Sequence, residues 1–507
     1  MKTQRIAIIG GGTAGWLAAN HLGRELHADP EVEITVIESE DVPIIGVGEG
    51  TVPSIKAALR RFGISEAELL LSCETTFKTG IKFQGWLDAG RHGPENFYYH
   101  PFATPFPGGV DIAPWWVQQG HEAPAFHHVS MSAGLSEAGR CPKRVESGAY
   151  EGEVDYAYHV NAHQFAKLLA RNAQQRFGVK HRLATVLGAE RQPNGDIGAL
   201  RTKNGERWAF DFYVDCSGFA SLLTQQVLKV PFVDKSHQVL TDTALVQQVP
   251  FEPGAAIPPY TLARAHEAGW IWDIPVTERR GTGFVYASSC MSEDAAVQAF
   301  AHYLGRPLQG FEPRKIAMKI GFRQEFWTHN CVALGLAQGF VEPLEATSIL
   351  LTDFSANLLA KNFPRQLGDA GALRGHFNAA TRYAWERVID FVQLHYHLSD
   401  REDSEFWRAQ RCPTHLSAVL RERLAKWRLL PPHSTDFSSR FELFNVENFL
   451  YVLYGMHFAT QGFPISDLER QDGVEQLAQI HAHTRQLLKT LPSHEDWLRG
   501  LRRAAGR

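Results

Sequence analysis

The stretch RIAIIGGGTAGWLAANHLGREL, residues 5–26, decides the fold of this chain. An apolar run of strand length leads into a glycine-rich turn, and apolar residues at helical spacing follow. A second β-rich run, EITVIES, comes next and carries the acid Glu38 near its end. This order of strand, glycine turn, helix, strand and acid is typical of a dinucleotide-binding βαβ unit, and a merely structural glycine turn is the alternative. The sequence therefore predicts an α/β core of Rossmann type.

The glycines of the turn have separate tasks. Gly10 permits the tight turn, Gly12 lets the backbone approach a pyrophosphate, and Gly15 allows close packing of helix on strand. The start of the helix supplies free amides and a partial positive charge. An acid at the end of the second strand is placed to accept hydrogen bonds from a ribose. The predicted dinucleotide contacts are Gly10, Gly12, Thr13, Ala14, Gly15 and Glu38.

The composition of the chain excludes several classes of protein. A formal net charge of -4 gives no general attraction to nucleic acid or to anionic lipid. The six cysteines are scattered without a CxxC pair, which argues against a zinc cage or a disulfide framework, and no metal is expected. Neither a signal peptide nor an apolar stretch long enough to span a membrane is found. We expect a cytoplasmic protein without a membrane partner.

At 507 residues the chain is too long for one simple core. We expect residues 1–365 to form the cofactor-binding part, with two inserted aromatic-rich segments, 70–150 and 235–315; a segment such as 70–150 usually lines a cavity, and a long surface loop is the alternative. Helical periodicity dominates from residue 355 onward, so residues 366–507 are expected to form a helical subdomain. The basic tail WLRGLRRAAGR is predicted to be a solvated helix end.

Three further segments favour a flavin over a nicotinamide. GVGEGTVPS, residues 46–54, is a second glycine-rich loop, suited to crossing a bound cofactor. YVDCSGF places an acid between an apolar strand and a glycine turn. After GFVEPLEA a helix is predicted to begin at Thr347 and Ser348, whose amides can hold an anion or a polar edge of the isoalloxazine ring, ordinary capping being the alternative. The cofactor contacts added here are Gly48, Glu49, Gly50 and Asp215.

In this order, the glycine turn, GVGEGTVPS, TTFKTGIKFQGW, GWIWDIP (269–275) and GFVEPLEATSI resemble the flavin-dependent tryptophan halogenases. The resemblance implies an FAD-binding Rossmann-like domain of the aromatic-hydroxylase type with a mainly helical C-terminal substrate subdomain. A separate flavin reductase supplies FADH2, which reacts with O2 to give a flavin hydroperoxide. Chloride or bromide attacks this hydroperoxide, and the hypohalous acid reaches an indole-like or other electron-rich aromatic through a tunnel. A flavin-dependent aromatic monooxygenase and a non-catalytic flavoprotein are the alternatives.

The same resemblance assigns the catalytic roles to Lys78 and Glu345. As an ammonium, Lys78 hydrogen-bonds hypohalous acid; as a desolvated amine, it forms a haloamine. Glu345 either positions the acid or accepts the proton of the aromatic ring. Without the resemblance, Lys78 is interpreted as a surface lysine and Glu345 as a carboxylate that compensates a helix dipole.

GWIWDIP places Trp270 and Trp272 two residues apart, so in a strand both rings project from one face. The resemblance implies that the two rings form a wall near the flavin, which keeps the organic substrate away from the hydroperoxide. A core strand that ends at a proline is the alternative.

The resemblance also implies a halide site and substrate contacts. The amides of Thr347 and Ser348 hold the halide, and Ser348 stands where many relatives have glycine, so we expect a less free backbone and an altered pocket, with the preference for chloride or bromide left open. Phe449 and Leu450 stand where tryptophan-specific members have tyrosines, which favours a less polar indole over free tryptophan. A homodimer is left open. The remaining expected contacts are Val186, Leu336 and Ile349 for the flavin, and His100, Phe102 and Phe449 for the substrate.

Overall fold

The computed structural model describes residues 4–42, 46, 48–252, 254–364 and 370–506. The predicted βαβ unit is present as β1 (Gln4–Ile9), α1 (Thr13–Leu26) and β2 (Val32–Glu38). β1 and β2 are parallel, with Ile6 opposite Ile34. The prediction of a Rossmann-type unit is therefore confirmed.

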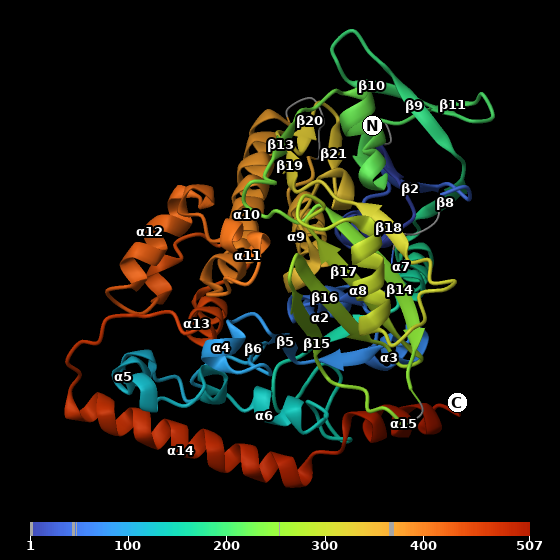
Figure 1. Ribbon diagram of the computed structural model, residues 1–507. Helices are drawn as coiled ribbons and strands as arrows, with labels where there is room; N and C mark the ends of the chain where they lie inside the picture. Colours follow the sequence, from blue (N-terminus) through green and yellow to red (C-terminus); the bar gives the residue numbers. More distant parts are fainter. Residues whose placement is uncertain (1–3, 43–45, 47, 253, 365–369, 507) are drawn as a thin grey trace.

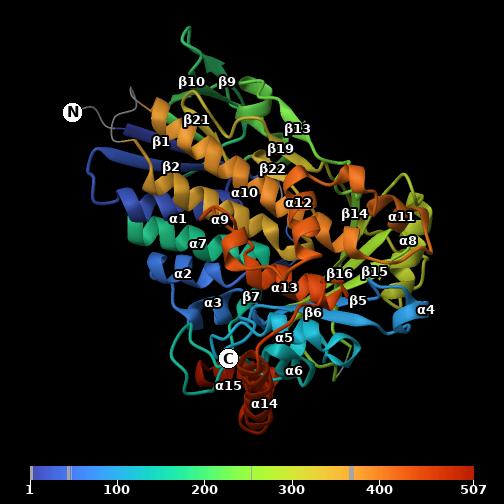
Figure 2. The same ribbon diagram turned by 90° about the vertical axis from the view of Figure 1, so that its left-hand side faces the viewer.

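Among the described residues, six strands form the sheet that contains this unit, in the order β20–β21–β12–β1–β2–β8. Neighbouring strands are parallel except β20 and β21. α1 packs against both α7 (Ala162–Phe177) and α9 (Thr347–Lys361), and the three helices lie side by side (Figure 2). The remaining strands of the sheet are β8 (Lys180–Leu183), β12 (Phe212–Asp215), β20 (Trp327–Thr328) and β21 (Cys331–Ala333).

A second sheet unites the two aromatic-rich segments. Its order among the described strands is β18–β14–β17–β16–β15–β5–β6, and β15 of the later segment pairs in parallel with β5 of the earlier one. GWIWDIP is the fully buried strand β16, so its predicted extended conformation is confirmed. The strands are β5 (Gly80–Gln84), β6 (Phe97–Pro101), β14 (Thr243–Pro250), β15 (Thr261–His266), β16 (Gly269–Pro275), β17 (Arg279–Tyr286) and β18 (Arg314–Ala317).

Among the described residues, three further sheets have three strands each. β3 (Glu49–Gly50) and β4 (Thr76–Lys78) both pair with β7 (Ala157–Val160), which brings the loop GVGEGTVPS beside the strand that ends at Lys78. The others contain β9 (Val186–Arg191), β10 (Ile197–Thr202) and β11 (Arg207–Ala209), and β13 (Phe232–Asp234), β19 (Gly321–Arg323) and β22 (Gly339–Phe340).

The described residues that follow α9 contain helices and turns but no named strand, which agrees with the expected fold class of an α/β cofactor-binding part and a mainly helical C-terminal part. The predicted boundary at 365/366 lies outside the described residues, so the division into domains stays a prediction. These helices are α10 (Gly371–Leu398), α11 (Glu405–Gln410), α12 (Ala418–Trp427), α13 (Val446–Gly455), α14 (Asp467–Thr490) and α15 (His494–Ala504). The earlier helices are α2 (Ser54–Phe62), α3 (Glu66–Ser72), α4 (Ala89–His92), α5 (Ala113–Gln118), α6 (Ser132–Glu137) and α8 (Glu293–Tyr303).

The last two helices return to the N-terminal part. α14 runs along one side of the molecule against α5 and α6 (Figure 1), and α15 follows it. Phe77 directly precedes Lys78, and its backbone N–H donates a hydrogen bond of 3.1 Å to Nε2 of His494. Trp497 packs edge-on against the Phe77 ring. The basic tail is therefore a helix end, as predicted, but its first turns are docked on β4. No helix within the described ranges has the length and apolar character needed to cross a membrane.

Candidate active site

A cavity of about 540 Å³ lies between the glycine turn after β1, the loop around β3 and the start of α9. Its volume is in the range of pockets that hold a cofactor. Most of the predicted cofactor contacts line it: Gly10, Gly12, Thr13, Ala14, Glu38, Gly48, Glu49, Gly50, Val186, Leu336 and Ile349.

Gly15 and Asp215 have structural tasks in this site. A Cβ atom on Gly15 would lie 1.9 Å from the carbonyl oxygen of Gly10, so only glycine allows the helix to pack this closely. The buried carboxylate of Asp215 accepts hydrogen bonds from the backbone N–H groups of Ser217 and Leu223. We expected Asp215 to contact the cofactor directly. In the structure, Asp215 instead organises the turn beside the cavity.

The glycine turn gives a matched pair of substitutions. We expect Gly10→Ala to lower the free energy of unfolding by about 3 kcal/mol or more, because Gly10 has a φ of 116° and its Cβ would lie 2.2 Å from the carbonyl oxygen of Cys216. Gly12→Ala should fold normally, since no described atom lies within 4 Å of its Cβ position, yet it should bind FAD at least about tenfold more weakly. Thermal unfolding and flavin titration measure the two effects. Equal FAD affinity of wild type and Gly12→Ala would contradict the expected approach of the pyrophosphate.

Lys78 lies in the wall of the same cavity and is 1% exposed, so the alternative of a surface lysine is wrong. Its Nζ donates a hydrogen bond to the backbone carbonyl of Thr51 at 3.2 Å and lies 5.0 Å from the centre of the Phe102 ring. Burial lowers the pKa of Lys78 to about 8, while the charge of Glu345 opposes the shift. Both the ammonium and the amine are therefore accessible near neutral pH.

The lowered pKa of Lys78 has a consequence for stability. Burial penalises the charged form in the folded state, so wild type should gain about 3 kcal/mol relative to Lys78→Met as the pH rises from about 8 to 10.5, the interval in which only the unfolded chain keeps the proton. Below pH 8 the variant should be the more stable protein. Chemical denaturation at a series of pH values measures this difference. A constant difference between the two proteins would show that the lysine is not desolvated.

Glu345 ends the short turn η6 (Pro343–Glu345) and is 1% exposed. Both of its carboxylate oxygens lie 2.9 Å from Nδ1 of His100 on β6, and Oε1 lies 2.9 Å from Nε2 of His395 on α10. Burial by itself raises the pKa of this carboxyl, but the charges and hydrogen bonds of the two histidines outweigh burial and lower the pKa to about 2. Glu345 therefore carries a negative charge near neutral pH.

The histidines have partners that the sequence analysis missed. Nε2 of His100 donates to Oδ1 of Asn448 on α13 at 3.0 Å, and the hydroxyl of Tyr98 donates to Nδ1 of His395 at 2.6 Å. The only sequence signal for His395 is a histidine inside the apolar run DFVQLHYHL, and such a residue is more often an ordinary core histidine. Nothing in the local pattern singles out Asn448.

The expected substrate residues are placed differently from one another. Phe102 faces Lys78, and His100 contacts Glu345, so both lie beside the two residues expected to be catalytic. Phe449 packs in the aromatic core of the helical part, with its ring centre 5.0 Å from that of Phe391 and 5.2 Å from that of Trp427.

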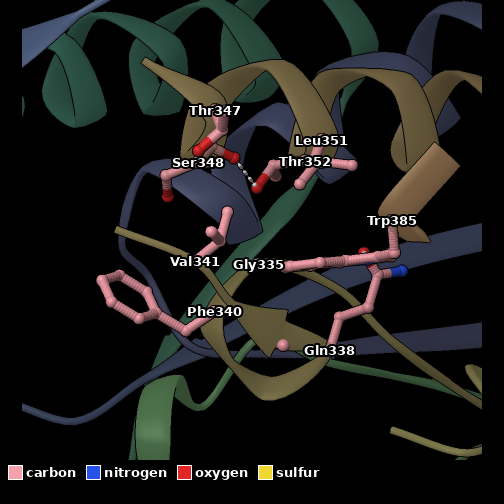
Figure 3. A pocket seen from close by; sticks show the side chains of 10 residues that line it. Gly335, Gln338, Phe340, Val341, Thr347, Ser348, Leu351, Thr352 and Trp385 are labelled. Atoms are coloured by element: carbon pink, nitrogen blue, oxygen red, sulfur yellow. Dashed lines mark hydrogen bonds between the residues drawn. The ribbon is translucent and has the colours of Figure 1, made fainter. Parts of the chain in front are cut away.

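Thr347 and Ser348 begin α9, as predicted, and line a second cavity of about 10 Å³, which is room for about one water-sized sphere. Figure 3 shows the two residues on one side of this cavity and Gln338 and Trp385 on the other. Ser348 also lines the large cavity. The first amides of α9 have no intrahelical acceptor. Ser348 is helical, and the left-handed residue just before α9 is Ala346, with a φ of 55°. The expected effect of Ser348 on backbone freedom and halide preference stays a prediction.

The two tryptophans of β16 have different surroundings. Trp272 lines the large cavity, and its ring lies against Gly283 on β17, where a Cβ would be 2.2 Å from the ring. Trp270 is 1% exposed, and its Nε1 donates a hydrogen bond to Oε1 of Glu342 at 3.1 Å. Of the expected wall, Trp272 is thus the part that faces the cavity, and Trp270 is directed at a buried carboxyl group.

The residues present fit a flavin dinucleotide, because the open space at Gly12 and the amides at the start of α1 suit a pyrophosphate. Within the described part of the chain, no group of three or more His, Cys, Asp and Glu side chains is arranged to hold a metal ion. The buried Lys78 lines this cavity, as the resemblance to flavin-dependent halogenases implies. The fold and the site together define a flavin-dependent halogenase, which is an enzyme.

Comparisons with known proteins agree. The family model described as tryptophan halogenase matches residues 5–467. The tryptophan 7-halogenase RebH of Lentzea aerocolonigenes is 32% identical over 98% of each chain. The structure of a tryptophan halogenase from Shewanella frigidimarina NCIMB 400 has a TM-score of 0.94 at 34% identity and covers 99% of this chain and 98% of that one. BrvH, a flavin-dependent halogenase from Brevundimonas sp. BAL3, has a TM-score of 0.87 at 31% identity over 99% of each chain. The chain belongs to the tryptophan halogenase family.

Proposed function

We propose that this enzyme uses FADH2, O2 and chloride or bromide to halogenate an indole-like or other electron-rich aromatic, with Lys78 directing the halogen. The observation that carries the proposal is the position of Lys78, which is buried and lines the cofactor cavity. When bound, reduced FAD with O2 supplies the oxidation that converts a halide ion into hypohalous acid.

The chain's own residues hold the reactants. The glycine turn and Glu38 hold the adenosine and pyrophosphate end of the cofactor, and Gly48, Glu49 and Gly50 hold its other half. The amides of Thr347 and Ser348, at the positive end of α9, bind the halide, and the small cavity beside them supports this assignment. Trp272 supplies the wall that separates cofactor and organic substrate.

Lys78 and Glu345 carry the halogen transfer. The ammonium of Lys78 hydrogen-bonds hypohalous acid, and when the aromatic ring attacks the halogen the O–halogen bond breaks and its oxygen leaves as water with a proton from the ammonium. Alternatively, the amine of Lys78 reacts with hypohalous acid to give a haloamine and water, and attack of the ring on the halogen then breaks the N–halogen bond and returns the amine. The fixed negative charge of Glu345 stabilises the ring cation formed by this addition. That cation is a far stronger acid than any carboxylic acid, so even a weakly basic carboxylate can take its proton. His100 and His395 keep the carboxylate oriented.

We propose that residues 366–507 supply the substrate side, through α13 and Asn448 behind His100. The aromatic neighbours of His100, Phe391 and Tyr451, favour a flat and weakly polar ring such as an indole over free tryptophan. A separate reductase driven by a pyridine nucleotide would supply FADH2, which fits a cytoplasmic location. A homodimer is part of the same proposal.

The test is an assay with a flavin reductase, NADH, FAD and O2, in which indole, tryptophan and phenol are each offered with bromide, chloride or neither. We expect a halogenated indole that appears only with halide and reductase, detected by mass spectrometry. A hydroxylated product that forms equally well without halide would refute the halogenase proposal and favour a monooxygenase.

A further inference from the structure

Glu342 is a buried carboxyl group that the proposed chemistry does not use. It is fully buried, and no lysine, arginine or histidine of the described residues forms an ion pair with it. Its partners are neutral donors: Nε1 of Trp270 at 3.1 Å, the hydroxyl of Tyr396 at 2.5 Å and the hydroxyl of Thr241. Burial raises its pKa to about 7, and the three hydrogen bonds oppose the shift. Such a group is costly to bury, so its position needs an explanation.

The three donors come from separate parts of the fold. Thr241 precedes β14, Trp270 lies on β16 and Tyr396 lies on α10, and all three are no more than 1% exposed. Together they fix one carboxyl group against the second sheet and the helical part at once. Glu342 is therefore an anchor point at which three elements meet.

Glu342 stands at the head of the catalytic turn. The turn η6 (Pro343–Glu345) follows it directly, Ala346 has its left-handed backbone next, and α9 begins at Thr347. The hydroxyl of Thr347 lies 3.5 Å from the backbone carbonyl of Glu342 as a weak hydrogen bond. A displacement of Glu342 is thus passed to Glu345 and to the first amides of α9, because only a few residues with constrained backbones lie between them.

We propose that Trp270 is a positioning residue: through Glu342 it holds the turn that carries Glu345 and the first amides of α9. The pair of tryptophans in GWIWDIP then has two tasks, with Trp272 as the wall of the cofactor cavity and Trp270 as the anchor of the turn. What the turn does in catalysis rests on the proposed function; whether Trp270 holds it does not.

The first test needs no turnover. Hydrogen exchange of the cofactor-free protein, followed by mass spectrometry, reports on peptides that cover residues 342–348. Trp270→Phe keeps the ring and removes the donor, and we expect amide exchange in these peptides to rise about tenfold. Trp86→Phe is the matched control, because Trp86 is equally buried beside Trp270 and donates to the backbone carbonyl of Ala263. Unchanged exchange in the Trp270→Phe variant would overturn the proposal.

A second pair guards against misfolding of the tryptophan variants. Thr241→Val removes the hydroxyl with almost no change of shape and should raise the same exchange, whereas Thr241→Ser keeps the hydroxyl and should behave as wild type. Equal exchange in the Val and Ser variants would count against Glu342 as the anchor.

The kinetic test distinguishes two roles of Trp270, that of an anchor for the turn and that of a wall beside the cofactor. If Trp270 anchors the turn, Trp270→Phe should raise the KM for halide about fivefold and lower kcat, while Trp86→Phe keeps the halide KM of wild type. If Trp270 were a wall, its replacement would leave the halide KM unchanged and give hydroxylated product, and this outcome would refute the proposal. Should wild type form no halogenated product, the proposed function fails, and hydrogen exchange still decides the role of Trp270.

Discussion

Replacement of Lys78 by methionine should lower kcat for halogenation about 10³-fold or more. Methionine fills a similar volume but provides neither an ammonium to hydrogen-bond hypohalous acid nor an amine to carry the halogen. Lys78 lines the cofactor cavity and is 1% exposed, so a water molecule cannot readily take over the role of its amino group in the variant. Rates of product formation under saturating reductase and halide measure the loss, and flavin titration should show FAD binding close to that of wild type.

Lys82 provides the matched control for this substitution. It lies four residues later on β5, and its Nζ pairs with Glu137 at 2.8 Å and lies over the Phe97 ring. We expect Lys82→Met to keep the wild-type rate within about twofold. A Lys78→Met enzyme that retained more than about a tenth of the wild-type rate would remove the lysine from the mechanism.

Glu345→Gln should lower kcat about 10²-fold and leave the KM for the aromatic substrate nearly unchanged. The amide keeps the shape of the side chain but removes the charge that faces His100 and His395 at 2.9 Å. Because the pKa of Glu345 is about 2, the wild-type rate should also show no decline from its protonation between pH 9 and pH 5. Pre-steady-state rates of product formation, measured for wild type and Glu345→Gln over this pH range, test the loss of rate and the absence of a pH-dependent decline.

Glu66 separates loss of a buried charge from loss of chemistry. It is also a buried carboxylate, paired with Lys143 at 2.6 Å and hydrogen-bonded by Tyr156 and Tyr158, in a part of the fold without a proposed catalytic role. Glu66→Gln should lower the melting temperature while the folded enzyme keeps its kcat. If Glu345→Gln lost activity only in proportion to its loss of folded protein, the catalytic assignment would fail.

The parts of the fold that could be predicted are those set by local pattern. The first strand, turn and helix of the βαβ unit follow from an apolar run, the glycines Gly10, Gly12 and Gly15 and an apolar helix within residues 5–26. The helix that begins at Thr347 follows from GFVEPLEA and the periodicity behind it. The need for glycine at position 10 could be predicted for the same reason, because a φ of 116° is a property of one residue and its neighbours. The importance of Lys78 could be predicted only from the family resemblance, because a lysine in a short strand carries no local signal of burial.

Long-range contacts were not predictable. The contacts of Glu345 join residues 100, 345 and 395, and Asn448 adds a contact to His100 from a fourth element. The parallel pairing of β15 with β5 is equally remote in sequence. Such contacts depend on how the chain closes over hundreds of residues, and residue spacing contains no record of that closure.

The sequence by itself determined that a cofactor turn, a helix start at Thr347 and a buried strand with two tryptophans exist, because backbone conformation and apolar periodicity are short-range properties. Only the tertiary structure decided which groups the side chains contact. Trp270 contacts a carboxyl group and Trp272 faces a cavity, whereas Phe449 packs in an aromatic core and Glu345 contacts two histidines. The reason is physical, since the charge state and the task of a side chain are set by partners brought to it through space, and those partners come from elsewhere in the chain.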